Sequence, residues 1–467
     1  MGSTGGGWHD EQAGGVIGRA RTPIAFVDDG LGNSSYLVDL GDRRGLVLDP
    51  TRHPGGYLAE AERRGLDIAF AVETHLHADF VSGGRELGLL GATLLVPGAG
   101  SHEFPVRGVA DGEEIDLGGL TLRALATPGH TPEHLAYLLL DGVTPMALFS
   151  GGSLLVDSVA RTDLIAPDQT ETLARSLWRS IHERILTLPD DLPVYPTHGA
   201  GSFCSAPAGG ERTTTIGRER RANPLLAVPD EDAFVKQLLD GLGTYPPYFL
   251  RLRDVNRRGP QRYGPGQPVL PALTPDAVAR LHAAGAWIID VRTIRAFADG
   301  HAPGSVSIAL RPQFASWLGW VVPDGAPLVF VLDREQDRAD LVRQARNVGY
   351  ETLLGELDGG IDAWKATGRK VATVPLARVE QSTGTVIDVR QRGEYESGHL
   401  PAARNIETGA VTTDAIPTGP VSVMCGHGER AMTAASLLAR DGRDDVTVLV
   451  GGPEDWARHH GRLDLGR

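Results

Sequence analysis

The sequence predicts a multidomain α/β protein whose second half contains one small α/β unit twice. Residues 288–308, IIDVRTIRAFADGHAPGSVSI, resemble residues 386–406, VIDVRQRGEYESGHLPAARNI, and GGIDAW (359–364) is answered by GGPEDW (451–456). In the first half, histidine motifs follow short apolar runs, an arrangement typical of sites built at strand ends. The length of 467 residues allows about three domains.

Each repeat is predicted to contain a strand, a loop with Gly-His-x-Pro, a second strand and a helix. The apolar runs that predict the strands are residues 287–291 and 328–332 in the first copy and residues 386–389 and 421–424 in the second. In the second copy, ERAMTAASLLARDG has the apolar spacing of a helix. The combination of D-V-R, G-H-x-P and G-G-x-x-x-W resembles the rhodanese family and implies two rhodanese-like domains.

The second copy carries a cysteine where its second strand ends. Cys425 opens the six-residue loop CGHGER, which closes at Arg430 as the helix begins. Backbone N–H groups and a helix N-terminus stabilise negative charge on sulfur, and a thiolate can take up a sulfur atom as a persulfide. We therefore predict that Cys425 is the sulfur-carrying nucleophile and that Arg430 adds a positive boundary. The alternative is a buried structural cysteine.

The first copy lacks this nucleophile. Its corresponding loop reads DREQDR, with Asp333 at the cysteine position and Arg338 at the arginine position. A carboxylate cannot carry a transferable sulfur, so this copy is predicted to be inactive and to space or orient the active one.

The first half has the histidine motifs THLHAD, TPGHTP and YPTH in that order. Imidazoles grouped at strand ends suit a borderline metal such as Fe²⁺ or Zn²⁺. The candidate metal ligands are His75, His77, Asp79, His130 and His198.

Together with RTDL (161–164), these motifs resemble the persulfide dioxygenases of the metallo-β-lactamase superfamily, in the form fused to rhodanese domains. The resemblance implies a metallo-β-lactamase αββα sandwich followed by two rhodanese-like α/β domains. It also implies one non-haem Fe²⁺, held by His75, His130 and an aspartate, with His77, Asp79 and His198 nearby. The expected divisions are a flexible N-terminus at 1–23, the metallo-β-lactamase-like domain at 24–256, a Pro/Gly-rich linker at 257–269 and rhodanese-like domains at 270–372 and 377–467.

Two positions depart from the family pattern. Phe80 replaces a histidine of the second metal position, and Gly152, in FSGG, stands where the aspartate is expected. Asp79 could substitute, His77 could complete a three-histidine site, or the domain could be a metal-free thiol-binding scaffold. We expect weak metal binding, and we expect that Gly152→Asp would raise iron occupancy with little rearrangement unless Gly152 has a positive φ.

Three functions are compatible with these motifs. The first is a persulfide dioxygenase-like enzyme and sulfurtransferase acting on thiol persulfides, sulfite and thiosulfate. The second is a thioester hydrolase like glyoxalase II, which needs two metals, Zn²⁺ being the alternative ion. The third is a sulfurtransferase with a scaffold domain. Cys204, shortly after His198, is either a sulfur acceptor or a small buried apolar residue. The spacing of His102, His134 and His182 does not suggest metal ligands, and Asp49 is interpreted as a structural turn residue.

Composition narrows the partners. The net charge is −14 and no basic tract carries interleaved aromatics, which argues against nucleic acid. No stretch approaches the roughly 18 apolar residues of a membrane span. Two cysteines are too few for a disulfide framework, which favours free thiols and the cytoplasm. The expected partners are small sulfur compounds, and the sequence is compatible with a homo-oligomer.

Overall fold

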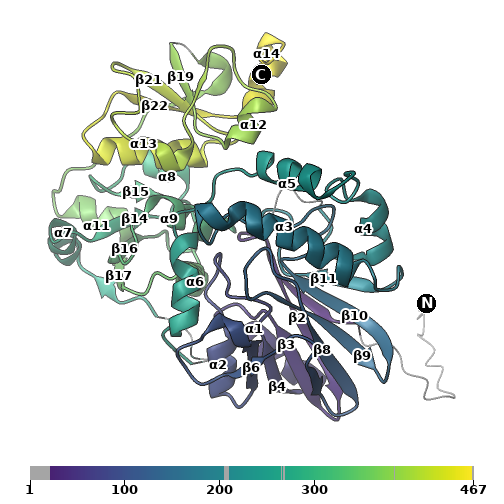
Figure 1. Cartoon of the computed structure of the whole chain (residues 1–467). Coiled ribbons are helices and arrows are strands. Elements are labelled where there is room, and N and C mark those ends of the chain that lie inside the picture. Colours follow the sequence, from purple (N-terminus) through teal and green to yellow (C-terminus); the bar gives the residue numbers. More distant parts are fainter. Residues whose placement is uncertain (1–21, 205–209, 265, 267–268, 383, 465–467) are drawn as a thin grey trace, which may run out of the picture.

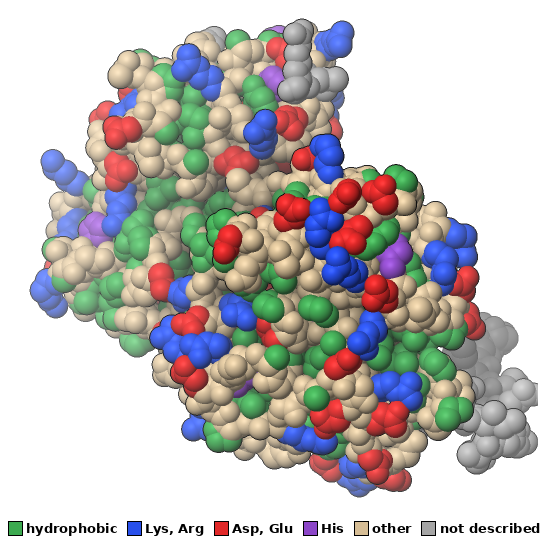
Figure 2. All heavy atoms as spheres, viewed as in Figure 1, with side chains coloured by type: hydrophobic (Ala, Val, Ile, Leu, Met, Phe, Trp, Pro, Cys, Tyr) green, Lys and Arg blue, Asp and Glu red, His purple; other side chains and the backbone are tan. Residues whose placement is uncertain are grey.

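The computed structural model describes residues 22–204, 210–264, 266, 269–382 and 384–464 (Figure 1). The expected flexible N-terminus lies outside these residues except for its last two positions. Among the described residues, no helix combines the length and apolar character needed to cross a bilayer. Figure 2 shows acidic and basic side chains interspersed over the visible face.

The first half contains two six-stranded sheets. The first has the order β1-β2-β3-β4-β5-β6, and the second has the order β12-β11-β10-β9-β8-β7. The strands of the first sheet are β1 (Ile24–Asp28), β2 (Asn33–Gly41), β3 (Arg44–Leu48), β4 (Asp67–Val72), β5 (Thr93–Pro97) and β6 (Arg107–Val109). Those of the second are β7 (Glu114–Asp116), β8 (Leu120–Ala126), β9 (Leu135–Asp141), β10 (Thr144–Gly151), β11 (Pro193–Pro196) and β12 (Thr214–Thr215).

The two sheets pack face to face, and helices cover their outer faces. Tyr36 and Val72 of the first sheet share one apolar core with Tyr137 and Phe149 of the second. The helices of this half are α1 (Gly55–Arg64), α2 (Gly84–Leu89), α3 (Thr170–Ser180), α4 (Ile216–Ala222), α5 (Glu231–Asp240) and α6 (Phe249–Arg258). Because α1 and α2 share a core with the first sheet and α3, α4 and α5 with the second, the expected αββα sandwich is confirmed.

The second half contains two parallel five-stranded sheets with equivalent orders, β13-β17-β16-β14-β15 and β18-β22-β21-β19-β20. The first unit contains β13 (Ala272–Leu273), α7 (Pro275–Ala283), β14 (Trp287–Asp290), α8 (Ile294–Asp299), β15 (Val306–Ser307), α9 (Phe314–Val321), β16 (Leu328–Val331), α10 (Arg338–Asn347), β17 (Leu353–Leu357) and α11 (Gly360–Ala366). The second contains β18 (Leu376–Arg378), β19 (Thr385–Asp388), α12 (Arg392–Glu396), β20 (Arg404–Asn405), β21 (Val421–Met424), α13 (Glu429–Arg440), β22 (Val446–Val450) and α14 (Pro453–His460).

The repeated motifs have equivalent structural roles in both units. Asp290 and Asp388 each accept from the arginine two residues later, at 2.6 and 2.7 Å. The histidine of each Gly-His-x-Pro motif stacks on an aromatic ring at 3.7 Å, His301 on Phe297 and His399 on Tyr395. The D-V-R and G-H motifs therefore stabilise the turns of each unit.

The first rhodanese-like unit packs directly on the sandwich. One apolar core joins Phe80 and Tyr248 to Phe314 and Trp317 of α9. The buried Arg52 donates to the Arg346 carbonyl at 3.0 Å across the same boundary.

The connecting segment takes part in this interface. The Gln261 carbonyl accepts from Arg52 at 2.9 Å, and the Tyr263 ring lies under the guanidinium groups of Arg52 and Arg346. The segment is therefore held against both domains where it is described.

Candidate functional site

The loop after β4 carries three of the candidate residues and is fixed from two sides. Asp49, at the end of β3 with a φ of 45°, accepts from the N–H and the hydroxyl of Thr74 at 2.7 and 2.8 Å. On the other side, Asn256 of α6 donates to the carbonyls of His77 and Phe80 at 2.8 and 2.9 Å. Asp49 is thus a turn residue, as expected, and it also anchors the candidate site.

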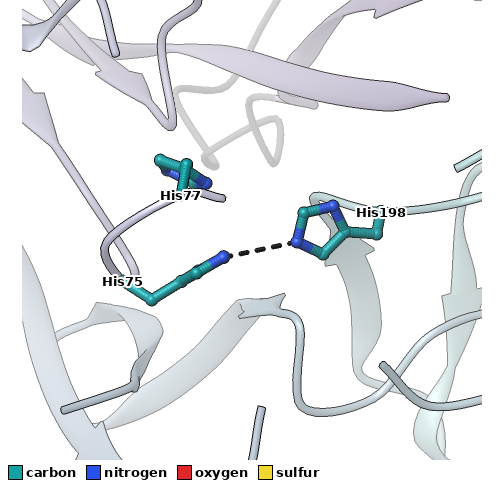
Figure 3. Close-up of side chains that lie close together, drawn as sticks. All are labelled: His75, His77 and His198. Carbon is teal, nitrogen blue, oxygen red and sulfur yellow. Dashed lines mark hydrogen bonds between the residues drawn. The ribbon is translucent and has the colours of Figure 1, made fainter. Parts of the chain in front are cut away.

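His75 and His198 face each other through their Nε2 atoms. The Nδ1 atom of His75 lies 2.8 Å from the Thr74 hydroxyl, which already donates to Asp49, so the imidazole is the donor. The Nδ1 atom of His198 donates to the side-chain amide oxygen of Asn33 at 3.1 Å. The two Nε2 atoms therefore carry their lone pairs inward. The distance between these two nitrogen atoms is 3.3 Å (Figure 3). Two lone pairs at this distance repel each other unless a proton or a cation lies between them.

His130 adds a third imidazole. It follows β8, and its Nδ1 donates to the Arg161 carbonyl at 2.7 Å. Its buried Nε2 finds no hydrogen-bond partner among the described residues. The ring centroid lies 4.8 Å from that of His75 and 5.2 Å from that of His198. Burial lowers the pKa of His130 to about 3, so the ring is neutral and keeps its lone pair.

His77 points its Nε2 atom away from this group. That atom lies 3.0 Å from Glu73 Oε2 and 3.2 Å from Asp49 Oδ1. Against the opposing effect of burial, Asp49 and then Glu73 raise the pKa of His77 to about 10. The ring therefore serves as the cation between two buried carboxylates. The Nδ1 of His77 has no hydrogen-bond partner among the described residues, and one ring nitrogen each of His75, His77 and His198 lie within 4.8 Å of one another.

Asp79 and Cys204 lie beside His198. Asp79 Oδ2 is 3.2 Å from His198 Nδ1, and, against the effect of burial, His198 lowers the pKa of Asp79 to about 2. A carboxylate behind the Nδ1–H of a ligating histidine makes its Nε2 a stronger donor to a metal. The ligand atoms of Cys204, His130 and His198 lie within 4.8 Å of one another. Cys204 is fully buried, and this burial raises the pKa of its thiol.

The position of Gly152 corrects one expectation. Gly152 does not have a positive φ, but a Cβ atom there would lie 2.5 Å from His130 Cδ2 and 2.9 Å from Cγ. The His130 ring fills the space that an aspartate side chain would enter. The expectation that Gly152→Asp needs little rearrangement is therefore wrong.

His134 belongs to this group, which its sequence spacing did not reveal. Its ring stacks on His75 at 5.1 Å, and its Nε2 accepts from the Gly152 N–H at 2.9 Å. Its Nδ1 lies 2.8 Å from the Thr127 hydroxyl. Because Nε2 is already occupied, His134 supports the site and offers no lone pair to a metal.

Phe80 explains the missing histidine of the loop. The ring is 1% exposed, stacks on His77 at 4.2 Å and belongs to the core shared with the first rhodanese-like unit. A position that binds a second metal in the family pattern here anchors a domain interface.

The second candidate site is the loop between β21 and α13. Cys425 is buried at its start, and its sulfur accepts from the Gly428 N–H at 3.1 Å. Arg430 donates to both oxygens of Glu394 at 2.6 and 2.8 Å. An amide donor and a helix N-terminus beside the sulfur suit a thiolate nucleophile.

The corresponding loop of the first unit is closed on itself. The Gln336 side chain accepts from the Asp333 N–H at 2.9 Å and donates to the Val291 carbonyl at 2.7 Å. Arg338 donates to the carbonyls of Asp333, Arg334 and Gln336 at 2.9, 2.9 and 2.6 Å. The Gln336 and Arg338 side chains are thus bonded to backbone groups at their own loop and at Val291.

Comparisons with known proteins match different parts of the chain to different families. The rhodanese-like domain family matches residues 274–367 and 376–459. Persulfide dioxygenase ETHE1 of Homo sapiens is 34% identical over 210 residues, which cover 43% of this chain and 74% of the human protein. The chain belongs to the ETHE1 persulfide dioxygenase family. This membership places it among the enzymes of sulfur metabolism.

A solved structure extends the likeness beyond the sandwich. A metallo-β-lactamase from Staphylococcus aureus is 30% identical, with a TM-score of 0.63, and the match covers 72% of this chain and 99% of that one. A hydroxyacylglutathione hydrolase from Methylococcus capsulatus is 35% identical over 170 residues, 36% of this chain and 62% of that protein. The chain thus resembles both a persulfide dioxygenase and a hydrolase.

Proposed function

We propose that the protein is a persulfide dioxygenase and sulfurtransferase, with one Fe²⁺ held by His75, His130 and His198. The metal proposal rests on three imidazoles whose Nε2 atoms converge: those of His75 and His198 lie 3.3 Å apart, and that of His130 has no hydrogen-bond partner among the described residues. His198 supplies the nitrogen that replaces the carboxylate missing at position 152. Because three imidazoles neutralise less charge than a ligand set with a carboxylate, we expect the site to bind iron more weakly than such a set and to fill when Fe²⁺ is supplied by reconstitution.

The surrounding residues would orient and shield this centre. Thr74, Asn33 and the Arg161 carbonyl fix the three imidazole tautomers, and the Asp79 carboxylate lies 3.2 Å from the Nδ1 of His198. When bound, iron supplies the O₂ chemistry. In the proposed reaction, one thiol persulfide, one O₂ and one water give one thiol, one sulfite and two protons. The outer sulfur is oxidised and O₂ is reduced.

The proposed sulfurtransferase step belongs to Cys425. Its thiolate attacks the outer sulfur of thiosulfate, the S–S bond of the donor breaks, and sulfite leaves with the bonding electrons. A thiol or sulfite then takes the sulfur from the Cys425 persulfide. Cys204 would need its thiolate form to accept sulfur, and burial disfavours that form. We therefore place sulfur transfer at Cys425 and regard Cys204 as lining the metal centre.

The distinction from a thioester hydrolase rests on Phe80 and Gly152, which remove ligands of a two-metal site. The test offers the iron-reconstituted protein glutathione persulfide and, separately, S-lactoylglutathione. We expect persulfide-dependent O₂ uptake with one sulfite per O₂, and no release of lactate. Lactate release without O₂ uptake would favour the hydrolase. The absence of both reactions would favour the scaffold.

A further inference from the structure

The first rhodanese-like unit forms one side of the Cys425 loop. A Cβ atom on Gly428 would lie 2.9 Å from Ile294 Cδ1 of α8. The N–H of Ser307 donates to Ser436 at 3.0 Å, and Thr433 donates to the Ser307 carbonyl at 2.7 Å. Figure 1 shows α13 lying along the first unit, near α8 and β15. The inactive unit therefore contacts both the catalytic loop and the helix behind it.

Two tryptophans of the first unit contact arginines at opposite ends of α13. The Arg430 guanidinium lies 5.4 Å from the centre of the Trp317 ring, beside the catalytic loop. The Arg440 guanidinium lies 3.4 Å from the centre of the Trp287 ring, at the other end of the helix. Both contacts are cation–π pairs across the same domain boundary, and only one adjoins Cys425.

The equivalent arginines of the two rhodanese-like units, Arg338 and Arg430, have different partners. Arg338, in the first unit, donates through Nη1 to three carbonyls of its own loop and through Nε to Glu356 at 3.0 Å. Arg430, in the second, instead gives both terminal nitrogens to Glu394, while the Trp317 ring covers its guanidinium. A planar guanidinium held on one edge by a carboxylate and against a ring has little freedom to rotate. Arg430 is 15% exposed, so this restriction acts in a largely buried place.

We propose that Trp317 of the inactive unit is a positioning residue for Arg430 in the active one. Trp317 and Glu394 together hold the arginine away from the loop carbonyls, so that its positive charge faces an anionic sulfur compound that approaches Cys425. The inference deepens the proposed function of the Cys425 loop and rests on it. It assigns the Asp333 unit a specific task in its neighbour's chemistry.

The test compares alkylation of Cys425 by the anion iodoacetate and by the neutral iodoacetamide. Peptide mass spectrometry separates Cys425 from Cys204. The ratio of the two rates reports the local positive charge and does not depend on sulfur transfer. We expect Trp317→Leu to lower the ratio at least threefold and to raise the KM for thiosulfate more than it lowers kcat. Trp317→Phe, which retains an aromatic ring, should have an alkylation ratio and a KM for thiosulfate close to those of the parent.

The matched control is Trp287→Leu, which removes the other cross-domain pair and should leave the ratio unchanged. An unchanged ratio in Trp317→Leu would overturn the proposal, as would an equal fall in both leucine variants, since that would report a loosened interface. If the parent protein does not turn over thiosulfate but the ratio falls only in Trp317→Leu, the sulfurtransferase proposal fails and the positioning role stands.

Discussion

Replacing Cys425 by serine is expected to lower thiosulfate-dependent sulfur transfer by about 10³-fold or more, because the nucleophile is lost while the loop is kept. The hydroxyl can still accept from the Gly428 N–H, which bonds the sulfur at 3.1 Å in the parent, so the fold should be undisturbed. The measurement is the rate of sulfur transfer to cyanide, together with the mass of the protein after incubation with thiosulfate. The parent should gain one sulfur atom on Cys425 and the variant none.

The control is Asp333→Ala at the corresponding position of the first unit. Gln336 and Arg338 bond only the backbone of Asp333, so the loop should keep its shape without the carboxylate. Turnover should stay within about twofold of the parent, as for an ordinary surface change. A large loss in folded Asp333→Ala, or unchanged transfer in Cys425→Ser, would show that the active and inactive loops have been assigned wrongly.

Replacing His130 by glutamine is expected to remove most of the iron. The variant loses the Nε2 lone pair that has no partner among the described residues, and an amide is a weaker ligand than imidazole for this ion. Iron content after anaerobic reconstitution should fall about tenfold or more, and persulfide-dependent O₂ uptake should fall with it.

The matched variant is His134→Gln, in the same cluster. Its ring lies beside His75, but its Nε2 already accepts from Gly152, a bond that a glutamine carbonyl oxygen can also accept. This variant should keep its iron. Equal iron in His130→Gln and the parent would remove His130 from the ligand set.

Local sequence was enough to predict much of the fold. The apolar run at 421–424 is β21, and the helix expected after CGHGER is α13. The spacing and the length of the apolar runs predict these elements, and both can be found in a short stretch of sequence. The repeat located the second unit because the D-V-R and G-H motifs stabilise the same turns in each copy.

The finer features of the site depend on contacts between distant residues. Nothing near His134 in the sequence indicates that it accepts from the Gly152 N–H, or that the His130 ring fills the space beside Gly152. The sequence marks Phe80 as a missing ligand, but the role of Phe80 in the domain interface depends on α9, far along the chain. The same holds for Trp317, whose partner belongs to a different domain.

In the proposed function, three imidazoles form a site for a single metal ion. The most direct measurement is the metal content of the full chain, purified without a histidine tag and reconstituted anaerobically with Fe²⁺ and Zn²⁺ in turn. We expect about one iron per chain, with a second equivalent of either ion not retained, because Phe80 and Gly152 replace ligands of the second metal position. Two tightly held zinc ions per chain, or no retained metal at all, would contradict it.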